Sequence, residues 1–283
     1  MKLATIRTAG TTRAVKVDGD VLADLGAADL GEFLSRPDWA ERAAMAGKAS
    51  VAAYGPDTDF APLVPRPSKI VCVGLNYRNH ILEMGRDLPE YPTLFAKFAD
   101  CLIGSKDDII RPPDTSKLDW EAELAVVIGK PARRASTPQA EAAIAGFTVL
   151  NDVTCRDWQF RTREWLQGKV WDSSTPIGPF LVTPDELPGG SRPALRITLT
   201  VDGDVMQSDT TSDLVYDPVA LVAYVSVIVR LNPGDIIATG TPGGVGHARH
   251  PPRFLAGGET VATEIEGVGR QENRVVMEAE GAA

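Results

Sequence analysis

Short runs of apolar and β-branched residues, separated by glycine, proline and Asp-Gly turns, recur along the whole chain. Runs of this length and composition predict β-strands. The predicted strands span residues 2–7, 14–17, 21–25, 70–74, 93–98, 119–130, 146–150, 195–201, 204–207, 235–238, 259–266 and 270–277. Helical patterns are expected at 30–34, 39–46 and 219–229. The predicted fold class is therefore mostly β with short helices.

The predicted helix at 219–229 has an unusual composition. It follows Asp217-Pro218, which supplies a capping carboxylate and a proline at the first helical position. The helix is apolar on nearly all sides. This pattern predicts burial either in the core or in a subunit interface.

Four prolines between positions 56 and 67 divide the chain into two parts. Such a density of proline predicts an extended linker. We therefore expect a small β-rich domain at residues 1–65, in which no catalytic residue is evident, and a larger domain at residues 66–283.

Composition excludes several classes of protein. The formal net charge of −9 argues against a nucleic-acid partner, because phosphate binding needs a basic surface. There is no apolar run of about 18 residues, so no membrane span is expected. The first residues lack the apolar segment of a signal peptide. The three cysteines are too few and too scattered for a disulfide framework, so a cytoplasmic location is expected.

The predicted strand at 119–130 carries the first candidate chemistry. Glu121 and Glu123 are two residues apart, so their side chains point to the same face of a strand. Two carboxylates at the start of an apolar run repel each other, and a bound cation relieves that repulsion. The pattern indicates a site for a hard divalent metal ion. The alternative is an edge strand with one solvated acidic face.

His80 and Glu83 form a second candidate pair. Their spacing of three residues places them on one face of a helical turn. A carboxylate beside a histidine orients the ring, as in a general base with its orienting group. The alternative is a surface His–Glu pair without a catalytic role.

Asp152, Arg156 and Gln159 form a third candidate group after the strand at 146–150. Spacings of four and three residues put the three side chains on one face if a helical turn starts at Asp152. A carboxylate for a metal, a guanidinium for an anion and an amide for a carbonyl then converge. The alternative is a capped helix start with an Asp–Arg pair.

Two further segments allow a binding role. Residues 239–246 form a glycine-rich turn whose N–H groups and two hydroxyls suit an anion such as a carboxylate, although a plain connection is the alternative. Lys169 lies in a polar, turn-rich segment and is either a substrate contact or a solvated residue. His247 and His250 have no neighbouring zinc ligands and are interpreted as loop residues.

Together these motifs resemble the fumarylacetoacetate hydrolase superfamily, in particular its longer bacterial members with a small N-terminal domain. The motifs that carry the resemblance, in order, are Gly74-Leu75-Asn76-Tyr77 with His80 and Glu83, Asp119-Trp120-Glu121-Ala122-Glu123-Leu124, Asn151-Asp152-Val153-Thr154 with Arg156 and Gln159, Lys169, and Thr239-Gly240-Thr241-Pro242. The resemblance implies a mixed β-sandwich roll over about residues 66–280, and commonly a homodimer.

The resemblance also implies roles for the candidate residues. Metal ligands would be Glu121, Glu123 and Asp152. Oxygen ligands without His or Cys favour Mg²⁺ or Mn²⁺, with Ca²⁺ also compatible, and no organic cofactor is expected. His80 and Glu83 would activate water. The residues expected around the substrate are Arg156, Gln159, Lys169, Gly240 and Thr241.

The activity expected from this resemblance is hydrolysis of a C–C bond in a 2,4-dioxo acid of the acylpyruvate or fumarylpyruvate type, which gives pyruvate and a carboxylic acid. Lys169 would help to stabilise the pyruvate enolate. Oxaloacetate decarboxylation and isomerisation of a 2-hydroxydienedioate are alternatives that use the same enolate chemistry. A protein that binds 2-oxo acids without turnover is an alternative of another class. An oriented pair such as His80 and Glu83 argues against it, because a pure binder needs no base.

Overall fold

The structure is a computed structural model that describes residues 1–47, 50–83, 85 and 87–279. Within these residues the larger sheet has ten strands, in the spatial order β4 (Ser50–Ala53), β3 (Val21–Asp24), β2 (Thr11–Asp18), β1 (Lys2–Thr8), β14 (Leu181–Val182), β11 (Ile144–Asn151), β10 (Ala122–Ile128), β17 (Ile236–Ala238), β5 (Ile70–Gly74) and β6 (Thr93–Lys97). Most neighbouring strands run antiparallel, but β17 and β5 are parallel.

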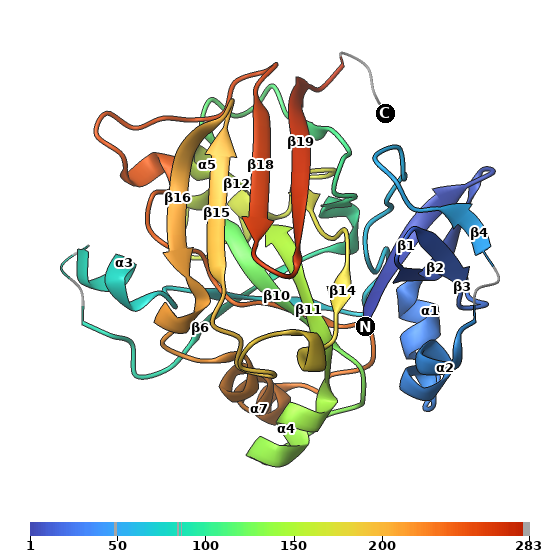
Figure 1. The fold of residues 1–283 in the computed structure, drawn as a ribbon. Coiled ribbons are helices and arrows are strands. Elements are labelled where there is room, and N and C mark those ends of the chain that lie inside the picture. Colours follow the sequence, from blue (N-terminus) through green and yellow to red (C-terminus); the bar gives the residue numbers. More distant parts are fainter. Residues whose placement is uncertain (48–49, 84, 86, 280–283) are drawn as a thin grey trace.

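A second sheet lies in front of β10 and β11 in Figure 1. In the described residues it consists of β16 (Asp204–Thr210), β15 (Arg196–Val201), β18 (Thr260–Ile265), β19 (Gly269–Met277) and β8 (Ile109–Arg111). Two short strand pairs join the layers: β9 (Leu118–Asp119) with β12 (Thr154–Cys155), and β7 (Leu102–Ile103) with β13 (Thr175–Pro176).

The helices of the described chain are short. They are α1 (Leu30–Leu34), α2 (Trp39–Met45), α3 (Arg78–Glu83), α4 (Thr137–Ala143), α5 (Arg156–Gln159), α6 (Leu166–Lys169) and α7 (Pro218–Ile228). The predicted fold class, mostly β with short helices, is confirmed. In the part of the chain that the structure describes, no helix is long and apolar enough to cross a membrane.

The central strand β10 is buried at every position because both faces of its sheet are covered. Leu124 and Val126 belong to the core between the two sheets, together with Ile197 and Val261 from the facing sheet. Ala125 and the other residues of the opposite face join a second core with the N-terminal helices. Alternation of side chains along a strand therefore supplies two cores from one continuous apolar run.

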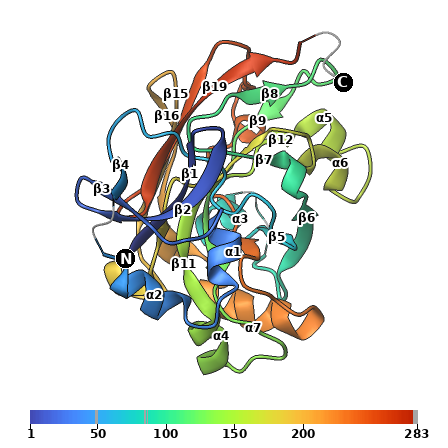
Figure 2. The same ribbon diagram turned by 90° about the vertical axis from the view of Figure 1, so that its right-hand side faces the viewer.

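The N-terminal residues continue the large sheet. Strand β1 pairs with β14 through Lys2–Val182 and Leu3–Leu181, so that β1–β4 extend the sheet beyond β11 (Figures 1 and 2). The indole N–H of Trp39 in α2 donates to the carbonyl of Gly129, just after β10, at 3.1 Å. The predicted division into domains at residue 65 stays a prediction.

The predicted helix at 219–229 is present as α7. The Asp217 carboxylate accepts a hydrogen bond from the backbone N–H of Ala220 at 2.9 Å, which caps its first turn. One face is buried, but Val227 and Ile228 are 50% and 60% exposed. One face of α7 is buried in the core, and its last turn is not. Burial in the core and burial in a subunit interface therefore both stay open as predictions for this helix.

Among the elements that differ from the sequence-based expectation are a strand, a helix and an N-terminal strand. The predicted strand at 119–130 is interrupted at Trp120-Glu121, between β9 and β10. Helix α4 was not expected, although the backbone N–H of Ser136 donates to the Gln139 side chain at 2.9 Å in a local start signal. Strand β4 also lies outside the predicted strands, because its short Ser50–Ala53 sequence has little β-branched character.

Replacement of Trp39 by Phe tests how the N-terminal segment is attached. The variant keeps a large ring but leaves the buried Gly129 carbonyl without its donor, so we expect the free energy of unfolding to fall by about 1–3 kcal/mol. Urea denaturation measures the change. Trp158→Phe is the matched control, because the hydrogen bond from that partly buried indole to the Asp114 carbonyl is exposed to solvent. Equal losses in both variants would contradict the role of Trp39.

Candidate metal centre and active site

Three carboxylates meet where β10 begins and β11 ends. The antiparallel register pairs Ala122 with Asn151, which places Glu121 and Glu123 beside Asp152. Two further bonds fix this corner: the Asp152 N–H donates to the Glu121 carbonyl at 2.8 Å, and the Glu121 N–H donates to the Asn151 side chain at 2.9 Å. One carboxylate oxygen from each of the three residues lies within 4.8 Å of the other two. The residues are 7%, 1% and 0% exposed.

Two buried lysines contact these carboxylates. Lys169 Nζ donates to Glu121 Oε2 and to Asp152 Oδ2, both at 2.7 Å. Lys97 Nζ donates to Asp152 Oδ1 at 2.7 Å and to the Val153 carbonyl at 3.2 Å. Burial alone would raise the pKa of Asp152, but Lys169 and Lys97 outweigh it and lower that pKa to about 2. The Asp152 carboxylate is therefore ionised at any physiological pH.

Glu123 has a different environment. Burial, together with Asp152 and Glu121, raises its pKa well above the ordinary value. Within the described residues, its Oε2 accepts a hydrogen bond from the backbone N–H of Gly240, at 2.8 Å. A buried carboxylate that faces two others and has no cationic partner there is suited to a metal cation. The donor set therefore fits a hard divalent ion.

Asp119 bonds to several groups around the site, although its sequence context predicts no role for it. Its carboxylate accepts hydrogen bonds from the backbone N–H groups of Gly246 at 2.7 Å and His247 at 2.9 Å. It also accepts one from Arg156 Nε at 2.8 Å. The sequence pattern that could have identified Asp119 is the alternation that identified Glu121, because Asp119 precedes Glu121 by two residues.

Arg156 and Gln159 lie at the site, but the expected helical turn does not begin at Asp152. Strand β12 intervenes and α5 begins at Arg156. Arg156 therefore pairs with Asp119 and with Glu121, whose Oε1 lies 2.7 Å from Nη1. Nη1 also donates to Gln159 Oε1 at 2.9 Å. The expected Asp152–Arg156 convergence on one helical face is wrong, and the convergence arises from tertiary contacts.

The glycine-rich turn uses its N–H groups on the protein's own carboxylates. Gly240, whose φ is +101°, donates to Glu123, and Gly246 donates to Asp119. Thr241 Oγ1 accepts a hydrogen bond from Gln207 Nε2 at 2.8 Å, so that its own hydroxyl hydrogen is left to donate elsewhere. Contacts of Gly240 and Thr241 with a substrate stay predictions.

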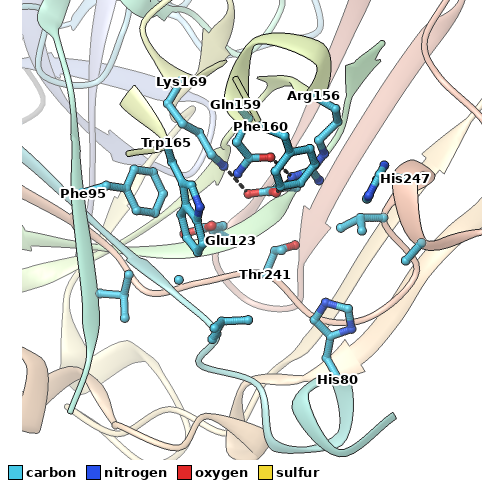
Figure 3. Close-up of a pocket in the computed structure, with 16 residues that line it drawn as sticks. His80, Phe95, Glu123, Arg156, Gln159, Phe160, Trp165, Lys169, Thr241 and His247 are labelled. Atoms are coloured by element: carbon cyan, nitrogen blue, oxygen red, sulfur yellow. Dashed lines mark hydrogen bonds and ion pairs between the residues drawn. The ribbon is translucent and has the colours of Figure 1, made fainter. Parts of the chain in front are cut away.

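A pocket of about 470 Å³ opens over the carboxylates (Figure 3). Its polar lining comes from Glu121, Glu123, Arg156, Gln159, Lys169, Thr241, His80 and His247. Phe95 and Trp165 form an edge-to-face pair on one side, with ring centroids 5.5 Å apart. His80, from α3, lies across the pocket from the Lys169–carboxylate cluster. The side chain of Glu83 lies outside the described part of the structure, so the His80–Glu83 pair stays a prediction.

The sequence contained weak signals for two contacts that were missed. Lys97 is a charged residue in the otherwise apolar run at 93–98, and a buried strand lysine requires a partner. Gln207 ends a predicted strand, and its side chain accepts from the Ala122 N–H at 2.9 Å while it donates to Thr241. Neither partner can be read from the sequence because both lie far away along the chain.

Comparison with known proteins agrees with this geometry. The family model for the C-terminal domain of fumarylacetoacetate (FAA) hydrolase matches residues 69–276. The oxaloacetate tautomerase Fahd2a, mitochondrial, of Rattus norvegicus is 43% identical over 249 residues, which cover 87% of this chain and 79% of that protein. The chain therefore belongs to the fumarylacetoacetate hydrolase family, as its motifs predicted.

Two solved structures share the fold over nearly the whole chain. Fumarylacetoacetate hydrolase from Exiguobacterium antarcticum has a TM-score of 0.86 and 30% identity, and the match covers 98% of this chain and 100% of that one. Maleylpyruvate hydrolase from Sphingobium sp. SYK-6 has a TM-score of 0.80 and 27% identity, with the same coverage. Both matches include the N-terminal strands.

Lys97→Met tests the contribution of the buried Lys97–Asp152 ion pair to stability. The variant leaves the buried Asp152 carboxylate with one cation fewer, so we expect the metal-free protein to lose about 3–5 kcal/mol of unfolding free energy. Denaturant unfolding in the presence of EDTA measures it. Lys130→Met, at an exposed position, is the control. A loss no larger than that of the control would contradict the assigned contact.

Proposed function

We propose that this protein is a metal-dependent enzyme that interconverts the enol and keto forms of a small 2-oxo diacid such as oxaloacetate. The observation that carries the proposal is the pocket that joins the Glu121–Glu123–Asp152 cluster to the buried ammonium of Lys169. The name of the rat relative supports this reaction over the hydrolysis that the sequence motifs favoured.

The residues that would hold the metal are Glu121, Glu123 and Asp152. All three offer hard oxygen ligands, which favour Mg²⁺ or Mn²⁺, and Ca²⁺ fits the same donors. When bound, the ion supplies Lewis acidity toward the carboxylate and 2-oxo oxygens of the substrate. The homodimer and the cytoplasmic location expected from the sequence remain proposals; the rat relative is named as a mitochondrial protein.

Lys169 serves as a fixed positive charge rather than as a base. Burial alone would lower its pKa, but Asp152 and Glu121 outweigh that effect and raise it. The protonated amine is held by two hydrogen bonds of 2.7 Å, and an ammonium group has a third hydrogen to donate. Lys169 therefore stabilises negative charge on the oxygen of the enolate without moving a proton itself.

His80 is the residue that we assign to proton transfer. A tautomerase removes the proton of the enol hydroxyl and delivers a proton to the neighbouring carbon. His80 lines the pocket on the side opposite the Lys169–carboxylate cluster (Figure 3), so a substrate bound between them presents its carbon to the imidazole. Histidine titrates near neutral pH and can both accept and donate this proton.

The second candidate function is hydrolysis of a 2,4-dioxo acid to pyruvate and a carboxylic acid. The position of His80 also suits the activation of a water molecule, and the maleylpyruvate hydrolase structure has the same fold. Attack on the distal carbonyl would break the C–C bond and leave the same enolate beside Lys169. Decarboxylation of oxaloacetate would release CO₂ and give the same pyruvate enolate. A protein that only binds 2-oxo acids would form no product.

Metal removal and Glu123→Ala test the proposal together. We expect EDTA to abolish the decay of oxaloacetate enol absorbance, Mg²⁺ or Mn²⁺ to restore it, and Glu123→Ala to remain inactive after metal is added, because one of three ligands is lost. Pyruvate formation from oxaloacetate identifies a decarboxylase, and loss of acylpyruvate identifies a hydrolase. A catalysed rate of tautomerisation that is unchanged both by EDTA and by Glu123→Ala would contradict the metal hypothesis.

His80→Ala tests the proton-transfer role. We expect kcat to fall about 10²- to 10⁴-fold, since general acid–base catalysis contributes that much, while Mn²⁺ affinity measured by calorimetry stays unchanged. His250→Ala is the matched control, because His250 is exposed and does not line the pocket. A variant with unchanged kcat and normal metal binding would show that another group moves the proton.

A further inference from the structure

His247 is a pocket residue that neither the family motifs nor the proposed mechanism uses. It was interpreted as an ordinary loop residue, but the structure places its side chain in the lining of the catalytic pocket. Figure 3 shows it beside Arg156 and Phe160, on the side opposite Phe95 and Trp165. The pocket thus has an aromatic wall on one side and a wall with nitrogen donors on the other.

The backbone around His247 is fixed by the same carboxylate that holds Arg156. Asp119 accepts from the His247 N–H at 2.9 Å and from Arg156 Nε at 2.8 Å. The preceding Gly246 fits so closely that an added Cβ would lie 1.9 Å from the Arg253 carbonyl. The main-chain position of His247 relative to the Arg156 guanidinium is therefore set by these contacts.

The imidazole is held from its other side by Phe160. The two rings have centroids 5.0 Å apart and an interplanar angle of 42°. Phe160 follows Gln159 directly, and Gln159 is itself bonded to Arg156. Both His247 and Phe160 are exposed, so they stand at the rim of the pocket while the carboxylates lie at its base. Arg156 thus connects the rim of the pocket to its base, because it bonds both to Gln159 beside Phe160 and to Glu121.

This wall has donors that the protein leaves available. Arg156 Nη2 is buried and has no hydrogen-bond partner among the described residues. An unpaired buried guanidinium nitrogen is costly unless a ligand satisfies it. A 2-oxo diacid whose first carboxylate and oxo group lie at the metal ligands extends its second carboxylate toward the rim. An imidazole N–H and a guanidinium N–H are suitable donors for that group.

We propose that His247 is a specificity-determining residue that binds the distal carboxylate of the substrate, and so selects a diacid over a 2-oxo acid with an uncharged end. The inference rests on the proposed function, because it assumes a substrate anchored at Glu121, Glu123 and Asp152. Phe160 positions the imidazole. The aromatic pair on the opposite wall contributes contact area without distinguishing charge.

The kinetic test compares two substrates that differ at the distal end. Oxaloacetate carries the second carboxylate, and its 4-methyl ester lacks that charge. With His247→Leu, which keeps packing against Phe160 but removes the donor, we expect KM for oxaloacetate to rise about tenfold and kcat to change less than twofold. KM for the ester should stay unchanged, and His247→Gln should recover most of the affinity for oxaloacetate. An equal effect on both substrates, or none, overturns the inference.

A binding measurement separates this inference from the proposed function. Calorimetry with the Mg²⁺-loaded protein compares malate, a 2-hydroxy diacid, with lactate, which lacks the distal carboxylate. We expect the wild-type protein to prefer malate about tenfold and His247→Leu to lose that preference. If this result holds but oxaloacetate is not tautomerised, the proposed function fails and the inference stands. A wild-type protein that shows no preference for malate overturns the inference, whatever reaction is found.

Discussion

Close packing of opposite charges in a water-poor corner is the constraint on which the rest of this structure depends. If all groups are ionised, four carboxylates and three cations meet at this corner, so one negative charge is left over. The carboxylates are Asp119, Glu121, Glu123 and Asp152, and the cations are Lys97, Lys169 and Arg156. Burial of a charge is costly unless it is paired and hydrogen-bonded. Each of these groups therefore requires a partner at a fixed distance. The excess negative charge lies on the side of Glu123, and this arrangement fits a divalent cation.

The two-sheet fold meets this requirement because it brings many separate segments to one edge. Lys97 ends β6, Asp119 belongs to β9, and Asp152 follows β11, so the charges come from strands that are not consecutive. The glycine-rich turn after β17 then supplies backbone N–H groups to Glu123 and Asp119. Main-chain donors are well suited to this task because they carry no side-chain entropy cost. The stability of this corner and the geometry of the candidate site thus depend on the same contacts.

The chemistry of the pocket follows from which charges are already satisfied. Two carboxylates hold Lys169 in its charged form, whereas His80 lines the opposite wall of the pocket. A rigid cation on one side and a titratable ring on the other support several reactions of one enolate. In the proposed function, the outer part of the pocket, where His247 and Phe160 lie, selects the substrate.

The sequence alone predicts those features of this protein that depend on local periodicity. Alternation put Glu121 and Glu123 on one face, and the apolar run that follows them predicted the buried central strand. The contacts between distant residues were decided only by the tertiary structure: Lys97 with Asp152, Arg156 with Asp119, and Gly240 with Glu123 are separated by 55, 37 and 117 residues. The reason is physical, because periodicity fixes the face on which a side chain lies, whereas strand order and register fix what stands opposite it.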